Sequence, residues 1–128
     1  MRWLSCIVGT TRVHVRADDV HSLIEYRVGP PPPLVSTYLV GIGILDDQLV
    51  MSVRVGLRPR TLDRVTKGVM LVTPASTLRW VLEVDSMQGF VSNKQVEPLT
   101  SEPAWLIRST GGERFLDVAA LVFSMERA

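Results

Sequence analysis

The titratable residues that could support acid–base or metal chemistry are few in this chain and stand apart. His14 and His21 are the only histidines among the 128 residues. Neither has a cysteine or an acidic residue at a spacing typical of zinc ligands. His21 follows Asp19 closely, but no nucleophile or orienting partner stands beside it as a general base requires. We therefore expect no metal, no cofactor and no catalytic site, and we interpret His21 as a surface histidine.

Two short motifs resemble catalytic or phosphate-binding elements and have simpler explanations. Asp46 and Asp47 form a pair of acids, but they follow an apolar stretch, where a polar hairpin turn explains both. Gly41 and Gly43 make a Gly-x-Gly motif inside the same apolar stretch. Because this motif opens no helix, it does not indicate a phosphate-binding loop.

The one local basic cluster comprises Arg58, Arg60, Arg64 and Lys67. Such a cluster could contact phosphates or an acidic partner. No aromatic residues interleave with it, so stacking on single-stranded nucleic acid is not supported, and the formal net charge is only +1. A solvated linker explains the cluster better, and we expect no nucleic-acid partner. A small-barrel nucleic-acid-binding protein that uses this linker is the alternative function.

Composition predicts a small globular protein with a substantial core. Hydrophobic residues make up 46% of the chain and charged residues 21%. Cys6 is the single cysteine, so no intrachain disulfide can form, and we expect it to be a buried small hydrophobe in a reducing compartment. No apolar run is long enough to span a membrane, and the stretch before Cys6 is too short for a signal region. We expect a cytoplasmic protein that does not insert into membranes.

The elements that must position any site repeat along the chain. The sequence aligns with itself at a shift of 67 residues. Each copy reads as an apolar strand, an acidic turn, an apolar pair, a proline and a strand led by an aromatic residue. Matched positions are Val13 with Trp80, Val15 with Leu82, Asp18 with Asp85, Val20 with Met87, Leu23 with Phe90, Ile24 with Val91, and 38–40 with 105–107. Two diverged copies predict two similar lobes, and the seam between them is a natural binding place.

Alternating apolar residues and turn residues predict mainly strands. We expect strands at 3–8 and 12–16, a hairpin of 38–45 and 49–55, a second hairpin of 68–73 and 78–84, and strands at 105–110 and 114–116. Asp18 and Asp19 suit the start of a short helical turn whose apolar face is Val20, Leu23 and Ile24. Residues 117–125 lack a helix breaker and predict a C-terminal helix.

The remaining segments read as connections. Residues 57–67 are a polar connector between the two copies, and Pro98 and Pro103 bracket a loop. The run Pro30–Pro33 favours an extended polyproline conformation. A rigid connector explains this run, with a ligand for an aromatic groove as its alternative. Short, regularly spaced strands with Gly and Pro turns favour small barrels over a layered α/β fold.

Several segments together resemble the CheW-like family of chemosensory adaptor domains. The resemblance lies in an acidic turn with its apolar run, an aromatic-led Gly-rich strand, a returning strand, and two later segments. These segments are Asp18 to Ile24, Tyr38 to Asp47, Gln48 to Val55, Leu82 to Val91, and Gly112 to Asp117. The match runs through nearly the whole chain in order and spacing, and the internal repeat supports it independently.

The resemblance implies a mainly β fold of two SH3-like five-stranded barrels with short helices, including a C-terminal helix. We expect a single domain over residues 1–128, with lobes at approximately 12–66 and 67–116. The N-terminal strand and the C-terminal helix complete the packing. It also implies a non-enzymatic adaptor that couples chemoreceptor signalling tips to a CheA-like histidine kinase.

The site residues follow from the same resemblance. An apolar groove between the lobes, with a polar rim, is the ordinary design for docking a receptor helix. We assign to it Val20, Val40, Gly41, Ile42 and Leu45.

Four residues form the expected kinase-contact surface: Ser22, Asp46, Asp47 and Arg54. Here the chain departs from the family pattern. Asp46 stands where the family has an arginine, Ser22 where it has a glutamate, and Arg54 where it has an aspartate. Asp47 replaces a glycine, and Ile44 an asparagine. Because a like-charge mismatch at a contact can cost several kcal/mol, we expect an adaptor that binds receptors with altered or lost kinase binding. Its oligomeric state stays open.

Overall fold

The computed structural model describes residues 2–29, 39–55, 64–74, 76–92, 98–101, 105–109 and 112–126. Within these residues the chain forms strands with one 3-10 turn and one helix. The N-terminal part comprises β1 (Arg2–Val8), β2 (Thr11–Arg16), the 3-10 turn (Ala17–Asp19), β3 (Val20–Val28), β4 (Leu39–Leu45) and β5 (Gln48–Val53). The rest comprises β6 (Arg64–Leu71), β7 (Arg79–Val84), β8 (Ser86–Ser92), β9 (Pro98–Ser101), β10 (Leu106–Ser109), β11 (Arg114–Leu116) and α1 (Val118–Glu126).

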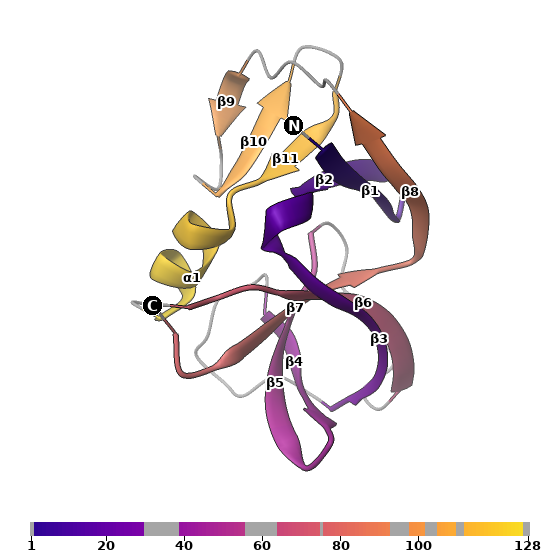
Figure 1. Ribbon diagram of the computed structural model, residues 1–128, viewed down its shortest axis with the longest axis vertical. Coiled ribbons are helices and arrows are strands. Elements are labelled where there is room, and N and C mark those ends of the chain that lie inside the picture. Colours follow the sequence, from indigo (N-terminus) through magenta and orange to yellow (C-terminus); the bar gives the residue numbers. More distant parts are fainter. Residues whose placement is uncertain are drawn as a thin grey trace.

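The strands make two lobes, one above the other in Figure 1. One lobe is a closed five-stranded barrel in the order β3-β4-β5-β7-β6. The other is a six-stranded sheet in the order β8-β1-β2-β11-β10-β9, with α1 beside it (Figure 1). The mainly β fold with two lobes and a C-terminal helix is confirmed. The second lobe differs from expectation, because β9 adds a sixth strand and its described strands do not close into a barrel.

The internal repeat is visible in the strand pairing. β5 pairs with β7 in parallel, and β11 pairs with β2 in parallel, while the neighbouring pairs are antiparallel. The shift of 67 residues carries β2 onto β7, β3 onto β8 and β4 onto β10. The first strand of each copy lies in the lobe built by the other copy. Each lobe therefore takes strands from both halves of the sequence, rather than from 12–66 or 67–116 alone.

The expected hairpins are present in the described residues. β1 and β2 pair with Cys6 opposite Val13, β4 and β5 pair across the turn at Asp46 and Asp47, and β6 pairs with β7. Both aspartates of that turn have positive φ, 50° and 61°. Asp tolerates this region, and two such residues make the tight hairpin turn whose twist suits the flanking strands.

The helical turn expected after Asp18 and Asp19 is wrong. Both residues lie in the 3-10 turn, and the apolar residues that follow belong to strand β3. Val20 and Ile24 are partly buried, whereas Leu23 is exposed. The spacing of Val20, Leu23 and Ile24 suits a helix, but the alternation from Val20 to Val28 suits a strand, and long-range pairing with β6 decides between them.

Two expected connections are also strands. Residues 64–67 of the predicted connector open β6, where Arg64 pairs with Val28 and Lys67 with Glu25. Residues 98–101 form β9 rather than a loop. β9 is an edge strand that begins at Pro98, and a missing backbone N–H is tolerated at that position. The Pro30–Pro33 run and residues 57–63 lie outside the described residues.

One continuous apolar core joins the two lobes. Its buried members include Val13 and Val15 of the sheet, Trp80 and Leu82 of the barrel, and Leu121 of α1. A smaller cluster fills the rest of the barrel around buried Tyr26, Val50 and Val81. Cys6 is fully buried, and burial raises the pKa of its thiol to about 11, so the thiol stays protonated and inert at neutral pH.

The Gly-rich motif in β4 serves close backbone packing. A Cβ atom on Gly41 would lie 2.1 Å from the carbonyl oxygen of Gly29 and 2.2 Å from Cγ1 of Val28. Both neighbours belong to the strand-end backbone and a buried side chain, so neither can move without opening the barrel. Only glycine fits this position.

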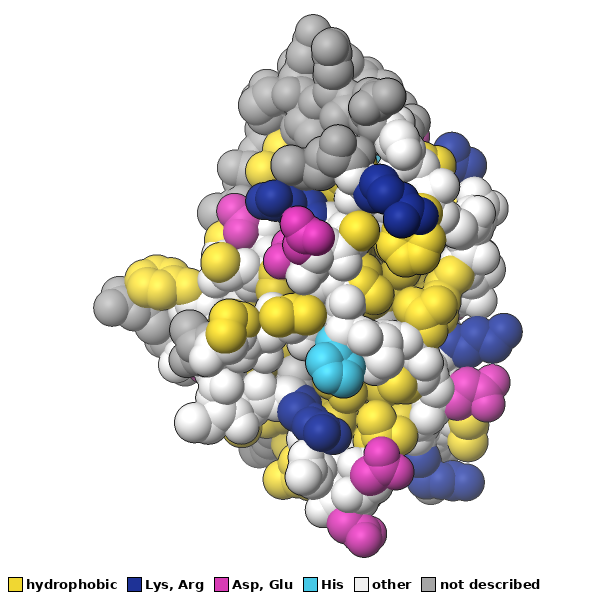
Figure 2. All heavy atoms as spheres, in the orientation of Figure 1, with side chains coloured by type: hydrophobic (Ala, Val, Ile, Leu, Met, Phe, Trp, Pro, Cys, Tyr) yellow, Lys and Arg dark blue, Asp and Glu magenta, His cyan; other side chains and the backbone are white. Residues whose placement is uncertain are grey.

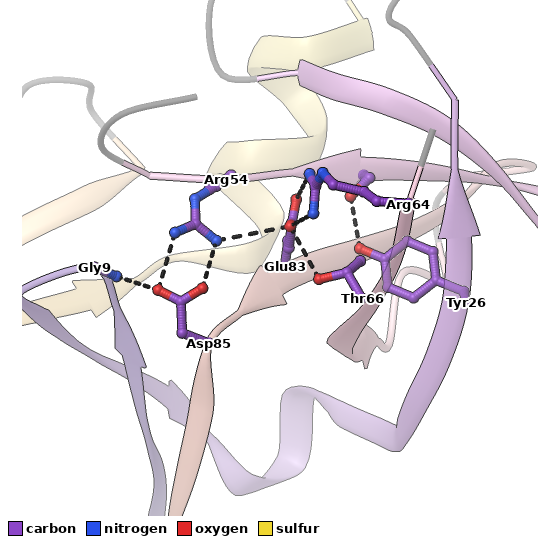
Figure 3. A network of polar contacts seen from close by, with 8 residues as sticks. Gly9, Tyr26, Arg54, Arg64, Thr66, Glu83 and Asp85 are labelled. Carbon is purple, nitrogen blue, oxygen red and sulfur yellow. Dashed lines mark hydrogen bonds and ion pairs between the residues drawn. The ribbon is translucent and has the colours of Figure 1, made fainter. Parts of the chain in front are cut away.

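The lobes are joined by an ion pair at the crossover from β7 to β8 (Figure 3). Asp85 is the single residue between these strands. Its carboxylate accepts two hydrogen bonds from the Arg54 guanidinium, at 3.0 and 2.9 Å, and one from the backbone N–H of Gly9, at 2.5 Å. Arg54 follows β5 of the barrel, and Gly9 forms the β1–β2 turn of the sheet. The Arg54 hydrogen bonds, followed by that from Gly9, hold the pKa of Asp85 below its usual range.

Glu83 extends this network into the barrel. It is buried on β7 and accepts a bidentate hydrogen bond from Arg64 and a third from the Thr66 hydroxyl. Arg54 also lies 3.7 Å from its carboxylate. The hydrogen bond to Glu83 raises the pKa of Arg64. The two arginines balance Glu83 and Asp85 in charge, as burial requires.

We predict that Gly41→Ala destabilises the protein by about 2 kcal/mol or more, because the added methyl overpacks the β3–β4 contact. Gly29→Ala is the matched control. Its Cβ would meet only the Ile42 carbonyl oxygen, at an ordinary 3.5 Å, so we expect a change within about 0.5 kcal/mol. Urea unfolding followed by tryptophan fluorescence measures both. Equal losses in the two variants would contradict the steric explanation.

We predict that Asp85→Asn lowers the free energy of unfolding by about 1–2 kcal/mol at pH 7, less than a fully buried pair would lose because the Asp85 side chain is 48% exposed. A lowered pKa in the folded state stabilises above the ordinary aspartate pKa of about 4, and this stabilisation disappears as pH falls through the lowered value. The difference between wild type and variant should therefore close in acid. Denaturant unfolding across pH measures it. A difference that persists in acid, or an equal loss in Asp18→Asn, would refute an ionic cause.

Candidate protein-docking groove

A groove opens at the end of the barrel where β3 begins and the β4–β5 turn closes. It has a volume of about 470 Å³. Its apolar wall includes Ile24, Leu45, Met70 and Leu78, with polar residues around it. The full lining is His21, Ser22, Ile24, Leu45, Asp46, 70–74, and 76–79. Figure 2 shows this kind of surface, with hydrophobic side chains gathered beside a histidine and charged groups at their edge.

A second hollow of about 450 Å³ lies against α1. Its walls are predominantly apolar, and acidic residues stand among them. It is lined by Asp19, 72–74, Val118, Ala119, Val122, Phe123 and Glu126. Val72, Thr73 and Pro74, which follow β6, line both hollows. The two hollows therefore form one apolar docking groove, divided by this short segment.

The five residues assigned to the receptor groove do not gather in one place. Leu45 lines the docking groove at the barrel end. Val20 packs against the main core, and Gly41 is buried under the Gly29 backbone. Ile42 lies on β4 opposite Met51, and neither hollow includes it. The side chain of Val40 lies outside the described part of the structure.

The four residues assigned to the kinase-contact surface also divide. Ser22 and Asp46 line the barrel-end hollow, and the Ser22 hydroxyl lies 3.0 Å from Nδ1 of His21. Asp47 is exposed beside Asp46 at the turn. Arg54 lies elsewhere: it is buried and its guanidinium is held by Asp85 and Glu83. Because that charge is committed inside the lobe junction, it does not form a surface with Asp46.

The other residues singled out from the sequence also have clear positions. His21 is exposed, as expected. His14 is buried, with Nε2 at 3.2 Å from the Glu113 carboxylate and its ring centroid 4.9 Å from that of Phe115. Of the basic cluster, Arg64 is paired with Glu83 and Lys67 is exposed, while Arg58 and Arg60 lie outside the described residues. The described half of the cluster is therefore not a basic patch.

Sequence reasoning missed the α1 side of the groove. Phe123 is 60% exposed and Val72 37% exposed, although both are large apolar residues. The C-terminal helix itself was predicted, and its run of apolar residues is longer than one buried face needs. That excess was the available signal that a second face of α1 meets something other than the core.

Among the described residues, no group of three or more His, Cys, Asp or Glu side chains is arranged to hold a metal ion. No helix in the described residues is long and apolar enough to cross a membrane.

No protein-family model matches the sequence, and no curated protein matches it either. Solved structures do match the fold. The scaffolding protein TtCheW from Thermoanaerobacter tengcongensis superposes with a TM-score of 0.63, over 90% of this chain and 86% of that chain. The two sequences are 13% identical over the match. At this identity the likeness concerns the backbone arrangement alone. The chain therefore has the CheW-like fold, with its sequence strongly diverged.

Proposed function

We propose that this protein is a non-catalytic adaptor of a bacterial chemosensory pathway, which docks the signalling tip of a chemoreceptor in the groove between the barrel end and α1. The observation that carries the proposal is an apolar groove with a polar rim on a fold shared with a scaffolding protein. In this role the protein acts in the cytoplasm at receptor arrays.

The groove suits an amphipathic helix. Its two hollows, of about 450 and 470 Å³, lie end to end and share one wall. Along them stand apolar side chains that the protein itself leaves partly uncovered: Val72, Leu78 and Phe123, at 37%, 39% and 60% exposure. A helix that lays its apolar face in a groove covers such side chains at intervals of three and four residues. Receptor signalling tips are helical hairpins and offer this kind of face.

The kinase side of the proposed role is weakened by charge. Asp46 and Asp47 project at an exposed turn where the family pattern has an arginine and a glycine. A charge change of two units at one contact position selects against a partner built for the arginine. We therefore propose that the protein binds receptors and binds a CheA-like kinase regulatory domain poorly.

No described feature favours the nucleic-acid alternative. Its strongest candidate within the structure, Arg64, is committed to Glu83 inside the barrel. Without a cationic stripe, counterion release has no surface on which to act.

We predict that Leu78→Asp weakens binding to a chemoreceptor signalling domain about tenfold, because it places a charge against the apolar face of the docked helix. Leu49→Asp is the matched control, since Leu49 is 61% exposed and lies outside the docking groove. Isothermal titration calorimetry with the receptor domain encoded nearest to this gene measures both. Absence of binding by the wild type at tens of micromolar, or equal loss in both variants, would reject the groove as the receptor site.

We predict that Asp46→Arg increases affinity for the kinase regulatory domain at least several-fold, because it restores the sign of charge at the contact. Asp47→Asn is the comparison for simple loss of an adjacent negative charge. Biolayer interferometry with the immobilised kinase domain measures the series. A wild type that binds as tightly as an ordinary adaptor would show that the charge change does not impair kinase binding.

A further inference from the structure

The internal repeat places two aspartates at equivalent crossovers between the lobes. Asp85 lies between β7 and β8, and Asp19 ends the turn between β2 and β3. Each crossover is hydrogen-bonded to the end of the first strand of a hairpin. The Asp85 N–H donates to the Ile7 carbonyl at 2.9 Å, and the Val72 N–H donates to the Asp19 carbonyl at 2.8 Å. The two sites thus have corresponding backbone positions.

At Asp85 the space beside the carboxylate is filled by the chain's own arginine. The Arg54 guanidinium makes two hydrogen bonds to it, and the aliphatic part of the side chain is buried, leaving only 10% of the side chain exposed. The repeat therefore shows, within this molecule, which group such a crossover aspartate accepts.

At Asp19 the corresponding space is the hollow beside α1. Residue 121 of α1, at the shift of 67 from Arg54, is the apolar core residue Leu121. In the described part of the chain no cation lies within ion-pair distance of Asp19. A volume of about 450 Å³ remains between the carboxylate, the segment after β6 and the helix. This volume exceeds the space that an arginine side chain requires.

The electrostatics of the hollow favour a cation. Burial raises the pKa of Asp19, and the Asp117 and Asp18 carboxylates add to this effect, while Arg16 opposes it. Glu126 lines the opposite part of the hollow and accepts a hydrogen bond from the Ser76 hydroxyl. A guanidinium brought to Asp19 would relieve repulsion among these acids.

The walls between the acids match the stem of an arginine. Val72, Pro74, Val118 and Val122 present apolar surface along the hollow. A hydrated metal ion gains nothing from such walls, whereas the methylene groups of an arginine pack against them while its head reaches a carboxylate.

We propose that this hollow receives an arginine side chain of a partner protein, with its stem against α1 and its guanidinium on Asp19. This deepens the proposed adaptor function and rests on it for the identity of the partner: the docked receptor helix would carry an arginine at the edge of its apolar face. The binding chemistry of the hollow stands on the structure alone.

The experiment uses two small probes with the isotope-labelled full chain. N-hexylguanidinium carries the charge and an apolar tail, and N-hexylurea is its neutral isostere. Two-dimensional NMR follows the backbone amides around Asp19, Val72 and Val118. We expect the guanidinium to shift these amides and to bind roughly three- to tenfold more tightly than the urea. Asp19→Asn should abolish this preference. Asp18→Asn, an equal charge change one residue away and outside the hollow, should retain it.

Several results would overturn the proposal. These are no shift with either probe at its solubility limit, equal affinity of the two probes, shifts that map elsewhere, or equal effects of Asp18→Asn and Asp19→Asn. Binding that appears only in an Arg127→Gln chain would mean that the protein fills the hollow with its own arginine. Unchanged amide spectra away from the hollow show that each variant is folded.

The outcome can be separated from that of the adaptor proposal. If receptor domains do not bind but the guanidinium preference holds, the hollow is a cation-accepting site for another partner. If receptor domains bind and Asp19→Asn leaves their affinity unchanged, the adaptor proposal stands and the arginine contact is wrong.

Discussion

The hydrogen-bonded pair of Arg54 and Asp85 is the interaction on which the arrangement of the lobes depends. Asp85 is the only residue between the last barrel strand and β8 of the sheet. Its N–H bonds to Ile7 and its carboxylate to Gly9, both in the sheet, while the same carboxylate bonds to Arg54 of the barrel. Because each lobe contains strands from both halves of the chain, this crossover must hold one geometry. A bidentate, charge-assisted pair is directional enough to do so.

The pairing network also explains why the docking groove is preformed. Removing one member would leave a buried charge without a partner, so the network stabilises a single arrangement of β5, β6 and β7 around Glu83. β6 carries Arg64 at one end of the strand and Met70 and Leu71, which line the groove, at the other. The polar network and the apolar groove therefore share one rigid strand, and a partner need not pay for ordering that strand on binding.

Local patterns predicted most elements and failed where distant contacts decide. Alternation and turn residues were sufficient for the hairpins and for α1, and the repeat was sufficient for two lobes. Val20, Leu23 and Ile24 fit a helix as well as a strand, and only pairing with β6 distinguishes the two. The exchange of first strands between lobes leaves no local signal. Arg54 looked like a surface charge because its partners, Glu83 and Asp85, lie about thirty residues away in sequence.

The divergence of the sequence is compatible with retention of the fold because the two depend on different residues. Core positions such as Val13, Val15 and Leu82 require only an apolar side chain of suitable size, so identity can fall to 13% while the backbone arrangement persists. Contacts with partners tolerate less, since a single charge at a rim changes specificity. The groove around Asp19 and the turn at Asp46 are consequently where this protein has its own character: at one crossover the repeat encloses its arginine, and at the other it leaves an acid in an open apolar hollow.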